Sequence, residues 1–237
     1  MKNIIVPLFT TLLILSCSKS TEDEFNEVNG NVAEKYVKSV QVIDNVNGNT
    51  TLTVNYGEAN RVSSITDGSA TSFFNYDSSN NLSSINDSDD TFSMSELYQA
   101  PYDAFETGQV LEYDDNSNPT KIKVYEDGYG SQLLTGTIIY DANPNPYFYT
   151  LKAAGGIAVL DRVDLNFGIT DPSIIKARNL FPNNNIRAMI FKDNNGITKY
   201  EVQFSYTYGN DKYPLSASVS TLSVDETTSY SLIYTYK

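Results

Sequence analysis

The sequence contains no histidine, no tryptophan and a single cysteine among its 237 residues. Without histidine the chain cannot build a Ser-His-Asp triad, a histidine-ligated zinc site or an imidazole general base. The cysteine, Cys17, follows an apolar N-terminal segment, where we expect it to carry lipid and not to act as a catalytic thiolate. No glycine-rich loop joins a strand to a helix, so no phosphate-binding loop is predicted. We therefore predict no cofactor and no metal site, and only carboxylates remain as candidate catalytic groups.

Positive charge is also scarce. The chain has 16 Lys and Arg residues against 29 Asp and Glu, a formal net charge of −13. Such a chain cannot neutralise a run of phosphates, so nucleic acid is excluded as a partner. The same charge opposes adsorption to anionic lipid head groups. Solubility outside the cell explains the acidity more simply than an acidic functional patch.

Strand-forming and turn-forming residues dominate what is present. There are 18 tyrosines and 11 phenylalanines, among many Asn, Ser and Thr residues, whereas the residues that fill long helices are few. This composition predicts an all-β fold, and the length suits one domain with a sizeable core.

A short phrase recurs along the chain: an aromatic residue, a polar turn, and apolar residues at offsets +6 and +9. It is clearest at Tyr76, with Leu82 and Ile85. The other occurrences begin at Tyr56, Tyr113, Tyr140, Phe191 and Tyr208, and three of them place a proline at +6: Pro119, Pro146 and Pro214. A polar turn between two strand-forming runs predicts a β-hairpin.

The two offsets have opposite parity, so in a regular strand their side chains face opposite sides of the sheet. Either both faces of the sheet are covered or a bulge realigns the residues. A proline at +6 fits the start or the edge of a strand. Alternation over 200–208, repeated over 230–236, predicts strands with one apolar face. We expect 36–237 to form one antiparallel meander, a curved sheet that is barrel-like or packed as a sandwich.

One short helix is predicted near 172–180. Asp171 and Pro172 suit the N-cap and first helical positions, and the helix would stop before Pro182.

The hairpin phrases resemble the YD repeat of RHS-type proteins. Together with the N-terminus and the segment from Tyr140-Asp141 to Asn143-Pro144, they resemble Bacteroidetes secreted lipoproteins that carry a domain of unknown function with a porin-like β-fold. This resemblance covers most of 38–237. It implies a β-fold and an envelope location, and the family has no established activity to carry over.

Residues 1–16 have the form of a signal peptide, with Lys2 followed by an apolar run of about a dozen residues that is too short to span a bilayer. Ile14-Leu15-Ser16-Cys17 resembles a bacterial lipobox, so we expect Cys17 to be the lipid-attachment site and the membrane to be a partner through that lipid. The alternative is an ordinary signal peptide with an incidental cysteine.

Residues 17–35 are polar and acidic, and we expect them to form a disordered tether. The stretch from Ser18 to Glu24 resembles a lysine-plus-acids tag for the cell surface. The predicted location is the outer membrane, facing either the cell surface or the periplasm.

Two acidic loops, at 87–90 and 114–116, could offer oxygen ligands to Ca²⁺, but the turn chemistry of Asp and Asn explains them better. Exposed tyrosines could stack on sugars, although alternate tyrosines on a strand suit a core. A membrane-spanning barrel is disfavoured by the lipobox and the long acidic loops.

The predicted function is a non-catalytic module that binds a glycan, peptide or protein partner, with no catalytic residues assigned. The alternatives are a carboxylate-dependent extracellular glycoside hydrolase and a structural envelope scaffold. Oligomeric state is not predicted.

Overall fold

The computed structural model describes residues 20–104, 107–125, 133–168, 173–223 and 226–237. Its main feature is one antiparallel sheet of 13 strands. In spatial order these strands are β6 (Thr91–Ser93), β5 (Leu82–Asn86), β4 (Thr71–Tyr76), β3 (Val62–Thr66), β2 (Thr50–Tyr56), β1 (Val37–Ile43), β16 (Thr227–Tyr236), β15 (Pro214–Leu222), β14 (Thr198–Tyr208), β13 (Asn184–Lys192), β10 (Leu133–Pro144), β9 (Pro119–Tyr125) and β8 (Gly108–Tyr113).

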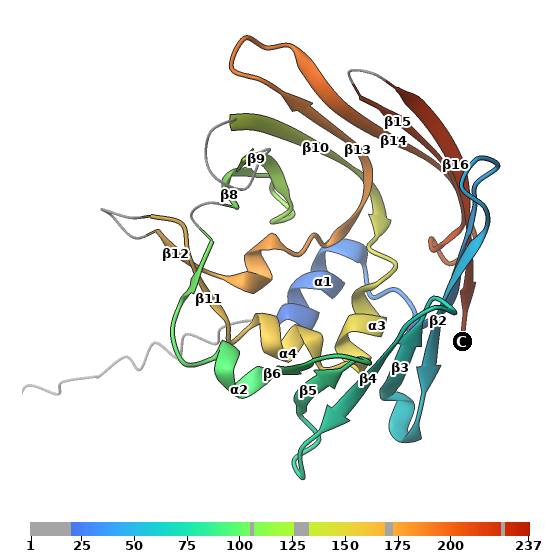
Figure 1. Ribbon diagram of the computed structural model, residues 1–237, viewed down its shortest axis with the longest axis vertical. Coiled ribbons are helices and arrows are strands. Elements are labelled where there is room, and N and C mark those ends of the chain that lie inside the picture. The colour runs from blue at the N-terminus through green and yellow to red at the C-terminus, as the bar shows by residue number, and fades with distance from the viewer. Residues whose placement is uncertain (1–19, 105–106, 126–132, 169–172, 224–225) are drawn as a thin grey trace, which may run out of the picture.

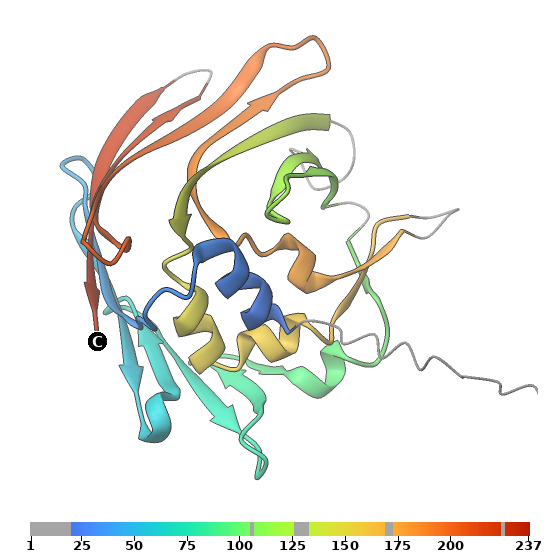
Figure 2. The ribbon, with the colours of Figure 1, turned by 180° about the vertical axis from the view of Figure 1, so that it is seen from behind.

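The first strand of the sheet, β1, lies near the middle of the strand order. Strand β1 pairs with both β2 and the last strand, β16, so the chain builds outward from β1 in one direction and returns to it from the other. The sheet is strongly curved and is not closed, because β6 and β8 are its two edges. Short helices lie on its concave side (Figure 1; Figure 2 shows the reverse view). The predicted all-β curved meander is confirmed.

The recurring phrases lie where the chain reverses. In the register of the sheet, Tyr56 faces Val62 and Tyr76 faces Leu82, with a register shift just before each tyrosine. Tyr113 with Pro119, and Tyr208 with Pro214, repeat this arrangement. A β-bulge therefore places the +6 residue opposite its aromatic residue. Of the two explanations for the opposite parity of +6 and +9, the bulge is the one observed. The prolines start β9 and β15, as predicted for residues that lack a backbone donor.

Two phrases differ from the prediction. The fifth turn pairs Lys192, not Phe191, with Thr198, so the phrase there is displaced by one residue. The Tyr140 phrase does not form a hairpin. Instead β10 runs on irregularly to Pro144 and leads into α3 (Phe148–Ala153), because the two prolines of that segment cannot continue the ladder.

Tyrosine hydroxyls join each hairpin to the one before it. A tyrosine in the last part of a strand donates to a backbone oxygen near the start of the neighbouring strand that precedes it in the chain. Observed pairs are Tyr56 to Val37 (2.7 Å), Tyr76 to Val62 (2.6 Å), Tyr140 to Pro119 (2.8 Å), Tyr206 to Ile186 (3.0 Å) and Tyr236 to Pro214 (2.9 Å). Three of these acceptors, Val62, Pro119 and Pro214, are +6 residues of earlier phrases. These hydrogen bonds thus connect neighbouring strands at one end of the strands.

The prediction of a disordered tether over 17–35 is wrong for the described part of that segment. Thr21–Asn29 form helix α1, which has a capping box between Ser20 and Asp23 and ends at Gly30 in the left-handed conformation (φ 75°). Its inner face is buried: Phe25 is 0 % exposed and stacks on Phe148 with ring centroids 3.7 Å apart. Asp23 and Glu27 are exposed and Glu22 and Glu24 are half-buried at the sides of the helix, and this acidic composition hid the helix in the sequence.

Three further α-helices and a small sheet complete the fold: α2 (Met94–Leu97), α3, α4 (Gly156–Leu160), and strands β7 (Tyr102–Asp103), β11 (Asp164–Asn166) and β12 (Ile174–Lys176). Short 3₁₀ turns are η1 (Glu58–Asn60) and η2 (Ala177–Leu180). The helix predicted at 172–180 is therefore only η2, since 174–176 pair with β11. Asp171 and Pro172 lie outside the described residues.

We expect Phe25→Ala to lower the free energy of unfolding by about 3–5 kcal/mol, because it empties a buried aromatic site against Phe148. Urea denaturation measures the change. The matched control is Phe73→Ala on β4, since that side chain is 54 % exposed and should cost much less. Equal effects from the two variants would mean that α1 is not part of the core.

Tyr76→Phe should destabilise the protein by about 1–2 kcal/mol, because it removes the donor to the backbone oxygen of fully buried Val62. Burial raises the pKa of the Tyr76 hydroxyl, which keeps it protonated as a donor. Tyr102→Phe, at a side chain 57 % exposed, is the control. If denaturation does not distinguish the two variants, the interlocking hydroxyls add no stability.

Candidate functional site

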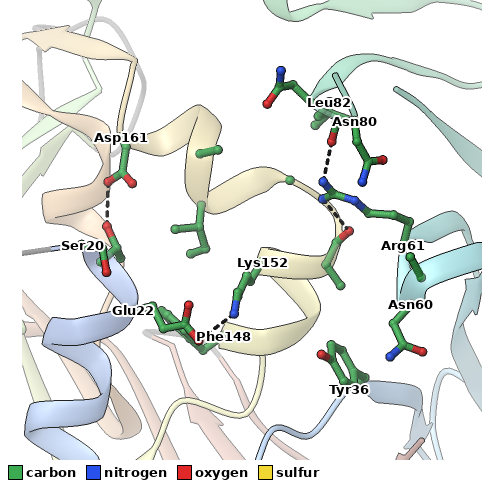
Figure 3. Close-up of a pocket in the computed structure, with 17 residues that line it drawn as sticks. Ser20, Glu22, Tyr36, Asn60, Arg61, Asn80, Leu82, Phe148, Lys152 and Asp161 are labelled. Carbon is green, nitrogen blue, oxygen red and sulfur yellow. Dashed lines mark hydrogen bonds and ion pairs between the residues drawn. The ribbon is translucent and has the colours of Figure 1, made fainter. Parts of the chain in front are cut away.

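A cavity of about 500 Å³ lies beside the start of α1. Its wall combines the first residues of α1, the corner between α3 and α4, and the turns that follow β2 and β4 (Figure 3). Its polar lining side chains include Glu22, Asn60, Arg61, Asn80, Lys152 and Asp161, and the buried side chains of Phe148, Ile157 and Leu82 pack behind them. No single stretch of sequence contributes more than a few of these residues.

The two turns owe their shape to local chemistry. Asn60 and Asn80 adopt positive φ (59° and 64°), which asparagine tolerates better than most residues. In the turn after β4, the Asp77 carboxylate accepts from the backbone N–H groups of Ser79 (2.9 Å) and Asn81 (2.8 Å). Both turns therefore place an asparagine in the cavity wall, and the Asn60 amide oxygen accepts from Lys237 Nζ at 2.9 Å.

Arg61 bridges three parts of the wall. Its guanidinium donates to the backbone oxygen of Ala153 at the end of α3 (3.3 Å) and to that of Asn80, and it lies 5.1 Å from the ring centroid of Tyr76. All these partners are uncharged. These contacts hold the guanidinium between the turn after β4 and the end of α3.

Lys152 lies on α3 and is neutralised. Its Nζ is 2.6 Å from a Glu22 oxygen and 3.8 Å from a Glu34 oxygen. The Glu22 pair ties α1 to α3 across the cavity (Figure 3). Because these side chains are partly exposed, the pair adds little stability. The pair places the Lys152 ammonium, a donor, and the Glu22 carboxylate, an acceptor, in the cavity wall.

The floor is closely packed. Gly155, between α3 and α4, has φ 79°, and a Cβ there would meet the Leu82 Cβ at 2.9 Å. Only glycine allows this close approach of the helix corner to β5. The floor of the cavity therefore cannot shift without disturbing the sheet.

The sequence identified none of these cavity residues as a site. Cys17, the one predicted site residue, lies outside the described residues. The two candidate calcium loops form turns: Asp87 accepts from the backbone of Asp89 and Asp90, and Asp114 from that of Asn116. Within the described ranges no group of three or more acidic or cysteine side chains could hold a metal ion.

Comparisons with known proteins give a distant likeness in fold. A crystal structure of a porin-like protein from Bacteroides uniformis has a TM-score of 0.43 and 13 % identity, covering 87 % of this chain and 99 % of that one. A porin-like protein from Bacteroides vulgatus has a TM-score of 0.40 and 11 % identity, covering 86 % and 99 %. No family model and no curated protein matches the chain. None of the described helices is long and apolar enough to cross a membrane.

Turn aspartates give the fold a definite pH dependence. Hydrogen bonds from the backbone of Ala70 and from Ser69 lower the pKa of Asp67 to about 2, and similar turn contacts lower the pKa of Asp77 and Asp193. Groups with a lowered folded pKa stabilise the fold fully above their unfolded pKa, about 3.9, and lose that contribution as pH falls through the folded pKa.

We therefore expect the free energy of unfolding to fall as pH drops from about 4 to about 2. Asp67→Asn should make this dependence shallower, because one carboxylate with a lowered pKa is gone. Urea denaturation across this pH range measures both. A variant whose pH dependence matches that of the wild type would show that the Asp67 turn is not linked to acid unfolding.

Proposed function

We propose that this protein is a non-catalytic binding module of the bacterial outer membrane, anchored by lipid on Cys17, whose cavity beside α1 takes a glycan. The observation that carries the binding proposal is the composition of the cavity wall. It offers amides, a guanidinium, an ammonium and carboxylates beside the half-buried aromatic ring of Tyr36. Hydroxyl-rich ligands need such a mixture of donors and acceptors beside an apolar surface.

The size of the cavity agrees with a small ligand. Ligand pockets are typically about 300–1,000 Å³, and this one is about 500 Å³. Asn60 and Asn80 carry both a donor and an acceptor, and the guanidinium of Arg61 can donate to a hydroxyl or to a sugar carboxylate. An acidic or neutral sugar is thus the preferred ligand class.

The hydrolase alternative would use the acidic residues of the same wall. Glu22 is paired with Lys152, and Asp161 accepts from the Thr21 hydroxyl at 2.7 Å and lies 3.7 Å from Arg178. Both carboxylates are thus already held by partners that tie α1 to its neighbours. This arrangement favours a structural role for them over acid–base catalysis.

Arg61→Gln should weaken glycan binding at least about tenfold, because a hydrogen bond from a charged donor contributes about 1.5–3 kcal/mol. A glycan array would identify the ligand, and calorimetry would measure affinity. The protein should begin at Ser18, which removes the lipidated cysteine and keeps the cap of α1.

Arg162→Gln is the matched control, since this arginine lies over the Tyr98 ring (3.9 Å) and does not line the cavity. Thermal unfolding of both variants separates a lost contact from a lost fold. Equal affinities in the two variants would reject the cavity as the binding site. Release of reducing sugar, abolished by replacing Glu22 or Asp161, would replace the binding proposal with the hydrolase.

A further inference from the structure

The chain is fixed in the fold from Ser20 onward. The Ser20 side chain accepts from the Asp23 backbone N–H at 3.1 Å, and the Asp23 carboxylate accepts from the Ser20 backbone N–H at 3.2 Å. The next residue, Thr21, is only 7 % exposed and donates to Asp161. Helix α1 therefore has no loose first turn.

The rest of α1 is held on several sides. Glu22 pairs with Lys152 of α3, and Glu24 pairs with Arg178 of η2. Deeper in the fold, Phe25 is enclosed by aromatic rings, and Asn29 donates to the backbone oxygen of Asn183 at 3.2 Å. The position of residue 20 is therefore fixed relative to the rest of the domain.

Only two residues separate Cys17 from Ser20, so three Cα–Cα steps join them. Since an extended chain spans at most about 3.6 Å per residue, the two Cα atoms lie within about 11 Å of each other. A flexible tether over 17–35 would have allowed a long and variable distance between the domain and the proposed lipid. The folded helix removes almost all of that length.

We propose that the domain is seated directly on a phospholipid bilayer through the rim around the start of α1. We define this rim as Ser20, Asp161, Arg162 and the turn 77–81. The inference rests on the proposed lipid at Cys17, and it adds an orientation: the rim faces the bilayer, and the opposite edge of the sheet points away. Ser20 and Asn80 also line the cavity, so the ligand site lies next to the membrane surface.

Charge does not seat the domain, because the net charge of −13 opposes adsorption to anionic lipid. The rim nevertheless exposes Arg162, whose positive charge helps to lower the pKa of nearby Asp77. An exposed guanidinium suits the phosphate of a zwitterionic head group. In this proposal, the short chain segment between the lipid on Cys17 and Ser20 holds the rim at the bilayer surface.

Energy transfer from the domain to labelled lipid tests the orientation. The natural chain has no cysteine besides Cys17, so Ser79→Cys in the rim and Asn49→Cys in the turn after β1 each give one site for a fluorescent donor. The two turns lie at opposite ends of the strands, about 20 Å apart along the strand direction for strands of this length. The acylated protein is reconstituted in phosphatidylcholine vesicles that contain an acceptor-labelled lipid.

We expect donors at residue 79 to show at least about twofold higher transfer than donors at residue 49, given that separation. Inserting about ten Gly and Ser residues before Ser20 should abolish the difference while the protein still floats with vesicles. Flotation with equal transfer at the natural spacing would overturn the seating alone. Failure of the acylated wild type to float better than Cys17→Ala would overturn the anchor, and this inference with it.

Discussion

The stacking of Phe25 on Phe148 is the contact on which the arrangement of this fold depends. An open, curved sheet leaves an apolar concave face that must be covered, and no second sheet of comparable size is present in the described chain. Helices α1, α3 and α4 cover it instead, and their aromatic cluster includes Tyr149, which meets both rings edge-on. Because α1 comes from the segment before the first strand, the N-terminal region acts as part of the core.

Buried asparagines extend this contact into the other half of the sheet. Asn118 is 0 % exposed, accepts from the backbone N–H groups of Asn183 (2.7 Å) and Asn184 (3.0 Å), and donates to the Asn184 side chain. Asn184 in turn donates to Asn29 of α1 (3.2 Å). Among the described residues no buried side-chain nitrogen or oxygen lacks a partner. A fully satisfied network of this kind fixes one geometry, since any displacement would leave a buried amide unpaired.

The hairpins could be predicted because their signals are local. Tyr76, Asp77 and Leu82 specify a turn and its register within seven residues, and the structure adds only the bulge that aligns them. Helix α1 also had local signals, namely the Ser20 and Asp23 capping box and Gly30 at its end. They were outweighed by the acidic composition, because a helix with a single apolar face one or two residues wide resembles a disordered segment. Tertiary contacts through Phe25 decide the matter, and composition does not report them.

The cavity could not be predicted, because its wall is assembled from segments far apart in the sequence. Arg61 follows a turn that looks like any other, and only the fold brings its guanidinium to Asn80 and to the end of α3. The same packing connects the cavity to helix α1. The contacts that hold α1 in place, Glu22 with Lys152 and Thr21 with Asp161, also form part of the cavity wall. The cavity wall and the position of α1 therefore depend on the same contacts.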